Sequence, residues 1–278
     1  MTQSYSTTTI IKPQSEQKLS DGMRELWQFR ELLWTFAIRN VGVRYKQTVL
    51  GIAWVVLQPL LTTAIFTLVF SHMARIPSQD APYPVFVFSG LLLWQYFSRC
   101  VLDGAGSLQA NSGMLSKVYF PRMLMPMVAP LSSAIDFAIS FMVLLALMFY
   151  YKVVPGFSVF AVPLLLIAAG MLGFGISLVL APLNALRRDI AIALPFVLQM
   201  AMYLTPIIYP ITFVPERFQW LFLLNPMATL LDGMRWALLG ATAPPVSAWA
   251  VFAGMLVLLL AAGRWLFRRT EATLVDAL

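Results

Sequence analysis

Cationic and aromatic residues just before a long uncharged segment carry the most distinctive chemistry of this 278-residue chain. Arg39, Arg44, Tyr45 and Lys46 all precede the apolar stretch that begins near residue 49. Arginine and lysine at the depth of the lipid headgroups suit phosphate binding, because they form charge-assisted hydrogen bonds with phosphate oxygens. The same residues would serve as a positively charged anchor on the cytoplasmic side of a membrane, and the residue types leave both roles open.

Two apolar segments each place aromatic rings and amides along one helical face. Residues three or four positions apart share such a face. Aromatic rings offer apolar surfaces to the C–H groups of sugars and amides bind hydroxyls, so these faces suit a passage for a glycan. Packing between helices, with glutamine bonding across them, explains the pattern equally well. The residues are Trp54, Gln58, Thr62 and Phe66 in the first segment and Phe196, Gln199 and Tyr203 in the second.

Asp136 is the ionisable residue that lies deepest within a predicted membrane span. Such residues are candidates for a proton relay, because a charge at that depth costs about 3 kcal/mol or more. One carboxylate without an intramembrane base makes a poor relay, however. We therefore favour an aspartate that faces a wet cavity or bonds to the neighbouring Ser132, Ser133 or Ser140.

Several kinds of chemistry are missing from the sequence. There is no Gly-Lys pair, and so no phosphate-binding loop of the Walker A type. A single histidine, His72, and a single cysteine, Cys100, exclude a His/Cys metal cluster and an internal disulfide. We predict no catalytic residue, no metal site and no cofactor in this chain, so any ATP would be hydrolysed by a partner subunit.

The composition sets the fold class. The chain is 60% hydrophobic and only 11% charged, whereas an ordinary soluble domain has about 45–50% apolar and about 25% charged residues. A soluble enzyme, a disordered chain and a fibrous repeat are excluded. The sequence predicts an all-α polytopic membrane protein.

Hydropathy divides the chain into a disordered cytoplasmic tail (1–20), an amphipathic interfacial helix (21–45) and a transmembrane domain (46–278). Two short apolar helices between the fifth and sixth spans, over 216–240, predict a re-entrant hairpin, with Asn225 and Pro226 starting its second helix. The six predicted spans are about 49–70, 81–101, 123–151, 158–182, 190–209 and 246–267.

The net charge of +7 indicates orientation rather than nucleic-acid binding. Most of the 19 Lys and Arg residues fall in the N-terminal segment, the second-to-third and fourth-to-fifth connections, and the C-terminal segment. By the positive-inside rule these segments and both termini are cytoplasmic. The second-to-third connection also holds a predicted short helix over 107–117, which either docks on a partner or is an ordinary surface connection.

The order of several short motifs resembles the type-2 ABC exporter permeases, and most closely the branch that exports lipid-linked O-antigen, capsule and teichoic acid. Residues from about Leu26 to the C-terminus follow that pattern. Asp232 and the pair Met234-Arg235 follow it only loosely. The motifs are RYKQTVLGIAW (44–54), QPL (58–60), YFPR (119–122), NALRRDI (184–190), LTPIIYP (204–210) and LNP (224–226).

The resemblance implies a homodimeric permease that binds two copies of a separate ATPase, which holds the ATP and magnesium. The passage would run between the protomers, along the first and fifth spans, and the hairpin would shape the outer exit. The helix over 107–117 would couple to the ATPase. The implied coupling residues are Ser107, Leu108, Asn111, Met114, Lys117, Tyr119, Phe120 and Arg122.

These features predict a multi-pass protein of the bacterial inner membrane that exports a polyprenyl-diphosphate-linked polysaccharide and contacts membrane lipids but no nucleic acid. Arg39, Arg44 and Lys46 would meet the diphosphate. Two alternatives remain at this stage, an ABC-2 exporter of a drug or small lipid and an ion-coupled carrier that uses Asp136. A membrane glycosyltransferase is disfavoured because no loop holds a pair of carboxylates.

Overall fold

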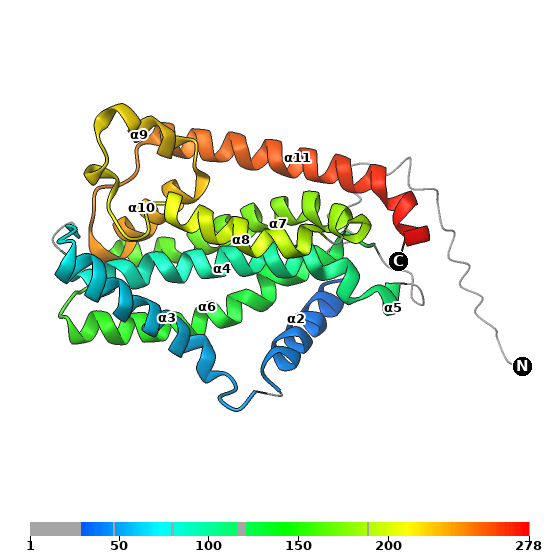
Figure 1. Ribbon diagram of the computed structural model, residues 1–278, viewed down its shortest axis with the longest axis horizontal. Helices are drawn as coiled ribbons and strands as arrows, with labels where there is room; N and C mark the ends of the chain where they lie inside the picture. The colour runs from blue at the N-terminus through cyan, green and yellow to red at the C-terminus, as the bar shows by residue number, and fades with distance from the viewer. Residues whose placement is uncertain (1–28, 47, 79–80, 116–120, 188, 278) are drawn as a thin grey trace, which may run out of the picture.

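The computed structural model of the chain describes residues 29–46, 48–78, 81–115, 121–187 and 189–277 (Figure 1). Within them the chain is helical and has no β-strand, which confirms the predicted all-α class. The predicted tail over 1–20 and the first part of the amphipathic helix lie outside the described residues. In chain order the helices are α2 (Arg30–Tyr45), α3 (Ala53–Phe66), the π-helix η2 (Thr67–Met73), α4 (Tyr83–Ala110), α5 (Ser112–Leu115), α6 (Leu124–Tyr150), the 3-10 helix η3 (Phe157–Ala161), α7 (Val162–Leu186), α8 (Asp189–Leu204), the 3-10 helix η4 (Ile211–Phe213), α9 (Glu216–Leu223), α10 (Pro226–Leu239) and α11 (Val246–Ala277).

Five of these helical stretches are long and apolar enough to cross a membrane, as the hydropathy pattern predicts. The fifth predicted span, over 190–209, differs. Its helix α8 has 16 residues, whereas a perpendicular crossing takes about 20. The helix ends at Leu204 because Pro206 has no N–H to continue it, and the chain then turns back toward the bundle. The five long stretches are Ala53–Met73, Tyr83–Ala110, Leu124–Tyr150, Phe157–Leu186 and Val246–Thr270.

Helix α4 forms the centre of the bundle and packs against α7, α6, α10, α3 and α8. Small residues bring α4 and α7 close together. A Cβ on Gly173 of α7 would lie 2.6 Å from the Cβ of Cys100, and a Cβ on Gly104 of α4 would clash with the hydroxyl of Ser177. Close backbone approach of this kind is the usual basis of helix packing in membranes.

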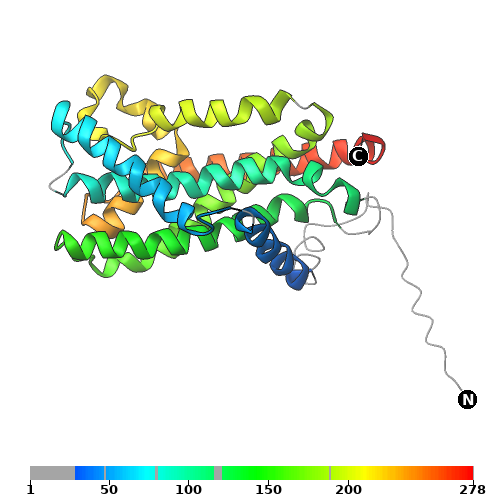
Figure 2. The ribbon, with the colours of Figure 1, turned by 60° about the horizontal axis from the view of Figure 1, so that its bottom comes forward.

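Helix α2 packs on one end of the bundle through a small second core. Leu33, Phe36 and Ala37 are buried there against Leu108 of α4 and Leu124 of α6. Figure 2 shows α2 leaving the bundle at an angle to the long helices. One face of the helix is therefore buried and the other exposed, as the amphipathic pattern indicates.

The predicted helix over 107–117 does not form a separate unit. Helix α4 continues without a break from Tyr83 to Ala110, and the direction changes at Asn111, before the single turn of α5. Ser107 and Leu108 are buried in the last turns of α4. Leu108 is buried in the same small core as α2, and burial there favours continuation of the helix, which the polar composition of this connection does not reveal.

The segment between α8 and α11 contains the two predicted short helices, α9 and α10. Asn225 begins α10 as predicted, since its side chain accepts a hydrogen bond from the backbone N–H of Met227 at 3.0 Å. Helix α10 is buried against α4, α7 and α11, while α9 is exposed. Whether the pair dips into the membrane stays a prediction.

The connections that carry most of the positive charge lie together. Helix α5, the end of α7 and the last turns of α11 are at the end where α2 packs, whereas α9 and the turn between α6 and α7 are at the opposite end (Figure 1). The charges are thus separated along the bundle. Which end faces the cytoplasm stays a prediction from the positive-inside rule.

Candidate functional site

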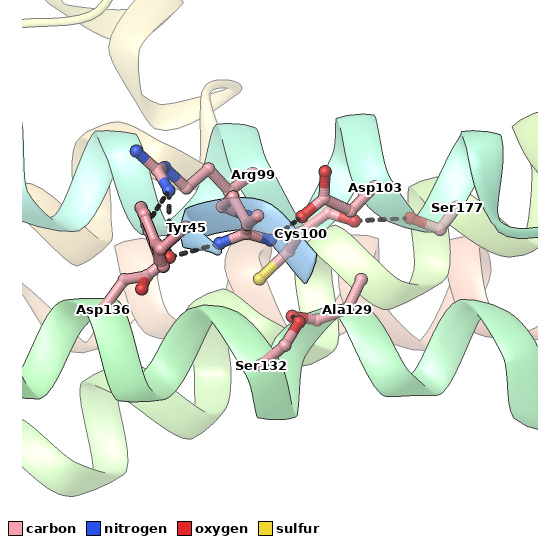
Figure 3. Close-up of polar contacts among 9 residues, drawn as sticks. Tyr45, Arg99, Cys100, Asp103, Ala129, Ser132, Asp136 and Ser177 are labelled. Atoms are coloured by element: carbon pink, nitrogen blue, oxygen red, sulfur yellow. Dashed lines mark hydrogen bonds and ion pairs between the residues drawn. The ribbon is translucent and has the colours of Figure 1, made fainter. Parts of the chain in front are cut away.

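Four charged side chains from three helices form an ion-pair cluster at the α2 end of the bundle. Arg44 of α2 donates to carboxylate oxygens of both Asp103 and Asp136. Arg99 of α4 donates to Asp136 at 2.9 Å and to the hydroxyl of Tyr45 at 3.1 Å. Figure 3 shows Arg99 on α4 and Asp136 on α6 facing each other with Tyr45 between the helices. The cluster joins α2, α4 and α6.

The expected partners of Asp136 were wrong. Its carboxylate bonds to two arginines rather than to the nearby serines: Ser132 donates to the carbonyl of Ala129 and Ser140 to that of Val55. The side chain of Asp136 is only 6% exposed, so its charge needs this compensation. An aspartate held by two guanidinium groups is a structural ion-pair partner and a poor candidate for an ion relay.

Arg44 remains charged although it is partly buried. Burial lowers the pKa of its guanidinium. The negative charges of Asp103 and Asp136 and the hydrogen bond with Tyr45 together raise the pKa by more than burial lowers it, so the pKa lies above its ordinary value. The cluster contains two arginines and two aspartates and is electrically balanced.

Beside the cluster, a groove of about 590 Å³ lies between α2, α4 and α6. Arg39 and Arg44 line it from α2, and Asp103 and Asn111 line it from α4 and its C-terminal end. Arg39 donates to the side-chain oxygen of Asn111 at 2.6 Å and lies 5.1 Å from the ring centre of Phe36. The structure therefore brings two of the predicted phosphate-binding residues into one groove.

The other two predicted phosphate-binding residues lie elsewhere. Tyr45 belongs to the ion-pair cluster, where its hydroxyl accepts a hydrogen bond from Arg99. Lys46 is exposed at the C-terminal end of α2 and does not line the groove.

The aromatic and amide residues on α3 and α8 point mainly away from the core. Trp54 is 44% exposed, Phe196 63% and Tyr203 46%, and Gln58 and Gln199 are also exposed. Both helices pack against α4, so the two faces are presented by neighbours of one central helix. A single chain leaves these faces without a protein partner among its described residues.

Thr62 and Phe66 are less available than the rest of that face. The hydroxyl of Thr62 donates to the carbonyl of Gln58 in its own helix at 2.9 Å. Phe66 packs on the core and meets Phe70 edge to face, with ring centres 5.6 Å apart. The last part of the predicted face therefore turns inward.

The implied coupling residues are divided between the core and the surface. Ser107 bonds the carbonyl of Gly104, and Leu108 is fully buried, so neither presents its side chain to another subunit. Asn111 and Met114 are partly exposed near α5, and Arg122 is partly buried at the start of α6. Lys117, Tyr119 and Phe120 lie outside the described residues.

A second polar junction, which the sequence did not assign, lies at the opposite end. Arg235 of α10 is 1% exposed, with its guanidinium carbon 3.8 Å from the ring centre of Phe86. It donates to the carbonyls of Pro206 and Ile207 at 2.6 and 2.9 Å, and Asp232 lies 3.5 Å away. Arg235 thus fastens α10 to the chain that follows α8.

The sequence contains an indication for two residues of the ion-pair cluster. Arg99 and Asp103 are four residues apart in one long helix, a spacing at which opposite charges share a face. Nothing comparable marks the pairing of Arg44 with Asp136, because 92 residues separate them.

The fold and these sites define the class of the protein. Five long apolar helices form a bundle with polar junctions at its two ends, and the described residues contain no group of three or more His, Cys, Asp or Glu that would hold a metal ion. Charged residues within a helical bundle of this kind are typical of membrane transport proteins.

The particular family follows from comparison with known proteins. The model of the ABC-2 type transporter family matches residues 31–239, and the chain belongs to this family. The expected resemblance is confirmed.

The chain has named relatives in O-antigen export and in polysialic acid transport. The chain is 31% identical over 206 residues, covering 74% of it and 79% of the relative, to an O-antigen export system permease protein RfbA of Klebsiella pneumoniae. It is 28% identical over 254 residues to RfbA of Myxococcus xanthus, covering 90% and 96% of the two chains. It is 23% identical over 209 residues to the polysialic acid transport protein KpsM of Escherichia coli, covering 73% and 79%.

Proposed function

We propose that this chain is the channel-forming permease subunit of an ATP-driven exporter, which moves a polyprenyl-diphosphate-linked, O-antigen-like polysaccharide across the bacterial inner membrane. The observation that carries the proposal is the exposed aromatic and amide face on α3 and α8, in a chain whose family relatives are named for O-antigen export. Rings and amides give sugars many weak contacts and no tight site, which suits movement along a passage.

Two protomers would enclose the passage between their α3 and α8 faces, and each would bind one separate ATPase subunit. The surface near α5, including Asn111 and Met114, is the proposed contact for the ATPase, which would supply ATP and magnesium. Both termini would be cytoplasmic, and α9 with α10 would form a re-entrant hairpin at the outer exit.

The diphosphate of the lipid carrier would bind at the α2 end of the bundle. Arg39 faces the groove, and among the described residues its polar partner is the neutral amide of Asn111. Arg44 faces the same groove but already bonds to two carboxylates. Arg39 is therefore the first contact for a phosphate, with Lys46 as an exposed cation at the end of the same helix.

The test uses the reconstituted complex of the dimer with its ATPase. Lipid-linked glycan should raise the ATPase rate by about fivefold or more, since substrate binding stabilises the transport-competent state. Glycan without the lipid diphosphate is the matched control and should leave the rate unchanged. A rate that ignores lipid-linked glycan but responds to a drug or a small lipid would establish the rival exporter function instead.

A further inference from the structure

The groove between α2, α4 and α6 contains two arginines in different electrostatic situations. Among the described residues, Arg39 bonds to a neutral amide, whereas Arg44 bonds to the carboxylate of Asp103. All three charged side chains line the groove. Within the described part of the chain, the groove therefore has one positive charge that is not paired with a carboxylate.

The two carboxylates that hold Arg44 also differ. The side chain of Asp136 is 6% exposed and is shared with Arg99, so the bond of Arg44 to Asp136 is a buried and doubly supported one. The side chain of Asp103 is 38% exposed and lies in the wall of the groove. Breaking a buried pair is costly because it strands a charge away from water, whereas a pair with a more exposed carboxylate is screened by water and is easier to break. Arg44 can thus leave Asp103 while it remains anchored on Asp136.

We propose that the carboxylate of Asp103 competes with the anionic ligand of this groove for the guanidinium of Arg44. Asp103 pairs with Arg44 when the groove is empty. A lipid diphosphate that binds displaces this carboxylate, and the pair forms again when the diphosphate leaves. The proposal rests on the lipid-diphosphate substrate proposed above. A lipid diphosphate attached to sugar carries two negative charges, and Arg39 with the freed Arg44 supplies two positive ones. Asp103 then turns its carboxylate to water.

The consequence is weak, reversible binding. A groove with two free arginines would hold a diphosphate tightly, and a transporter must also release its substrate. Because the competing carboxylate is part of the same groove, the free energy needed to displace it from Arg44 reduces the binding free energy of the diphosphate. Asp103 is therefore a residue that promotes release rather than a ligand.

The apolar part of the groove accepts the lipid chain without choosing between headgroups. Val43 of α2, Leu102 of α4 and Val128 of α6 line it beside the charges. A phospholipid with one phosphodiester would satisfy its single charge at Arg39 and leave the pair of Arg44 with Asp103 intact. The competitor should therefore affect diphosphates more strongly than phospholipids.

The experiment measures dissociation constants with the full chain in phosphatidylcholine nanodiscs. The probes are geranylgeranyl diphosphate and the short-chain phospholipid dihexanoyl phosphatidylglycerol. Asp103→Asn should tighten binding of the diphosphate by about fivefold, as expected for the loss of one partly exposed ion pair, and tighten binding of the phospholipid by less. Damage to the fold would weaken binding, so a gain in affinity distinguishes competition from a structural role.

Three further variants define the result. Asp103→Glu keeps the charge and should bind the diphosphate within about twofold of the wild type. Asp189→Asn removes an exposed negative charge at the same end of the bundle and should change neither constant. Arg39→Gln should weaken diphosphate binding by about fivefold, which places the probe in the groove.

The outcomes separate this inference from the proposed function. If the wild type binds the diphosphate and Asp103→Asn binds it no more tightly, or if Asp189→Asn tightens it equally, the competitor role is wrong while the substrate proposal stands. If neither the wild type nor Asp103→Asn binds the diphosphate, the substrate proposal fails and the inference fails with it.

Discussion

The ion-pair cluster shows how individual residues make the interfacial helix part of the bundle. Arg44 brings a positive charge from α2 to a buried carboxylate on α6, and Arg99 supplies a second cation from α4. A buried ion pair adds little net stability compared with apolar packing, but the loss of one partner is costly because it strands the other charge. The cluster therefore fixes the position of α2 more than it stabilises the fold.

Removing the buried carboxylate should destabilise the protein. Asp136→Asn leaves Arg44 and Arg99 close together, so we expect the free energy of unfolding to fall by about 3 kcal/mol. Denaturant titration of the purified chain in detergent micelles measures this change. Asp189→Asn, at an exposed site, is the matched control and should stay within about 0.5 kcal/mol of the wild type. Equal free energies of unfolding for the two variants would show that the ion-pair cluster does not stabilise the position of α2.

The contact between α3 and α6 shows how a helix-breaking residue sets the position of a whole element. Pro59 lies inside α3 and has no N–H for the carbonyl of Val55, four residues earlier. Ser140 of α6 supplies the missing donor, since its hydroxyl bonds that carbonyl at 3.0 Å in a buried position. The proline thus creates an acceptor that α6 satisfies, and the bond fixes the two helices relative to each other.

A double-mutant cycle tests this link. Ser140→Ala leaves a buried carbonyl without a donor and should lower the free energy of unfolding by about 1–2 kcal/mol. In a Pro59→Ala background the restored N–H bonds Val55 within the helix, so the same change should cost less than about 0.5 kcal/mol. Denaturant titration of the four proteins gives the coupling energy. Additive effects would mean that the serine does not replace the missing donor.

The whole molecule is asymmetric in how its helices are covered. Helix α4 is nearly enclosed, whereas α3 and α8 present aromatic and amide side chains outward on the surface of one chain. Lipid alone is a poor environment for the amides of Gln58 and Gln199. The proposed second protomer, with a polar passage between the two, would cover these amides.

Loss of the aromatic rings on these faces should slow export and leave assembly intact. Trp54→Ala with Tyr203→Ala removes two exposed rings, each worth about 1 kcal/mol of stacking, so the glycan export rate should fall by about fivefold or more. The measurement is export by the reconstituted complex, with the dimer followed by size-exclusion chromatography.

The matched control for this prediction replaces exposed rings elsewhere. Phe149 at the end of α6 and Phe160 in η3 are 87% and 79% exposed and belong to neither face. Phe149→Ala with Phe160→Ala should leave export unchanged. Unchanged export in Trp54→Ala with Tyr203→Ala would instead remove these residues from the passage.

Much of the fold was predictable because it depends on local properties. Apolar stretches of span length place the long helices, and Asn225 with Pro226 marks the start of α10. The predictions were wrong at the ends of α4 and α8, where contacts with distant parts of the chain determine the end of the helix. Leu108 is buried in the small core that α2, α4 and α6 share, so α4 runs on to Ala110, and Pro206 ends α8 where the chain turns to meet Arg235.

The candidate site was only partly predictable. The sequence indicated Arg39 and Arg44 by their type and position, but it did not distinguish the arginine with a neutral partner from the arginine held by two carboxylates. That difference changes their proposed roles. Asp103 was not a candidate at all, because its proposed role depends on a groove that three helices form together.

The sequence by itself determined that this chain is a helical membrane protein with its positive charge concentrated in a few connections, and its ordered motifs identified the ABC-2 family. Hydropathy and charge are properties of short segments, so they can be read from the sequence without knowing how the helices pack. Only the tertiary structure decided which charges neutralise each other, where Arg235 is buried and which aromatic faces stay exposed. Those outcomes depend on contacts between segments many residues apart, which local pattern does not encode.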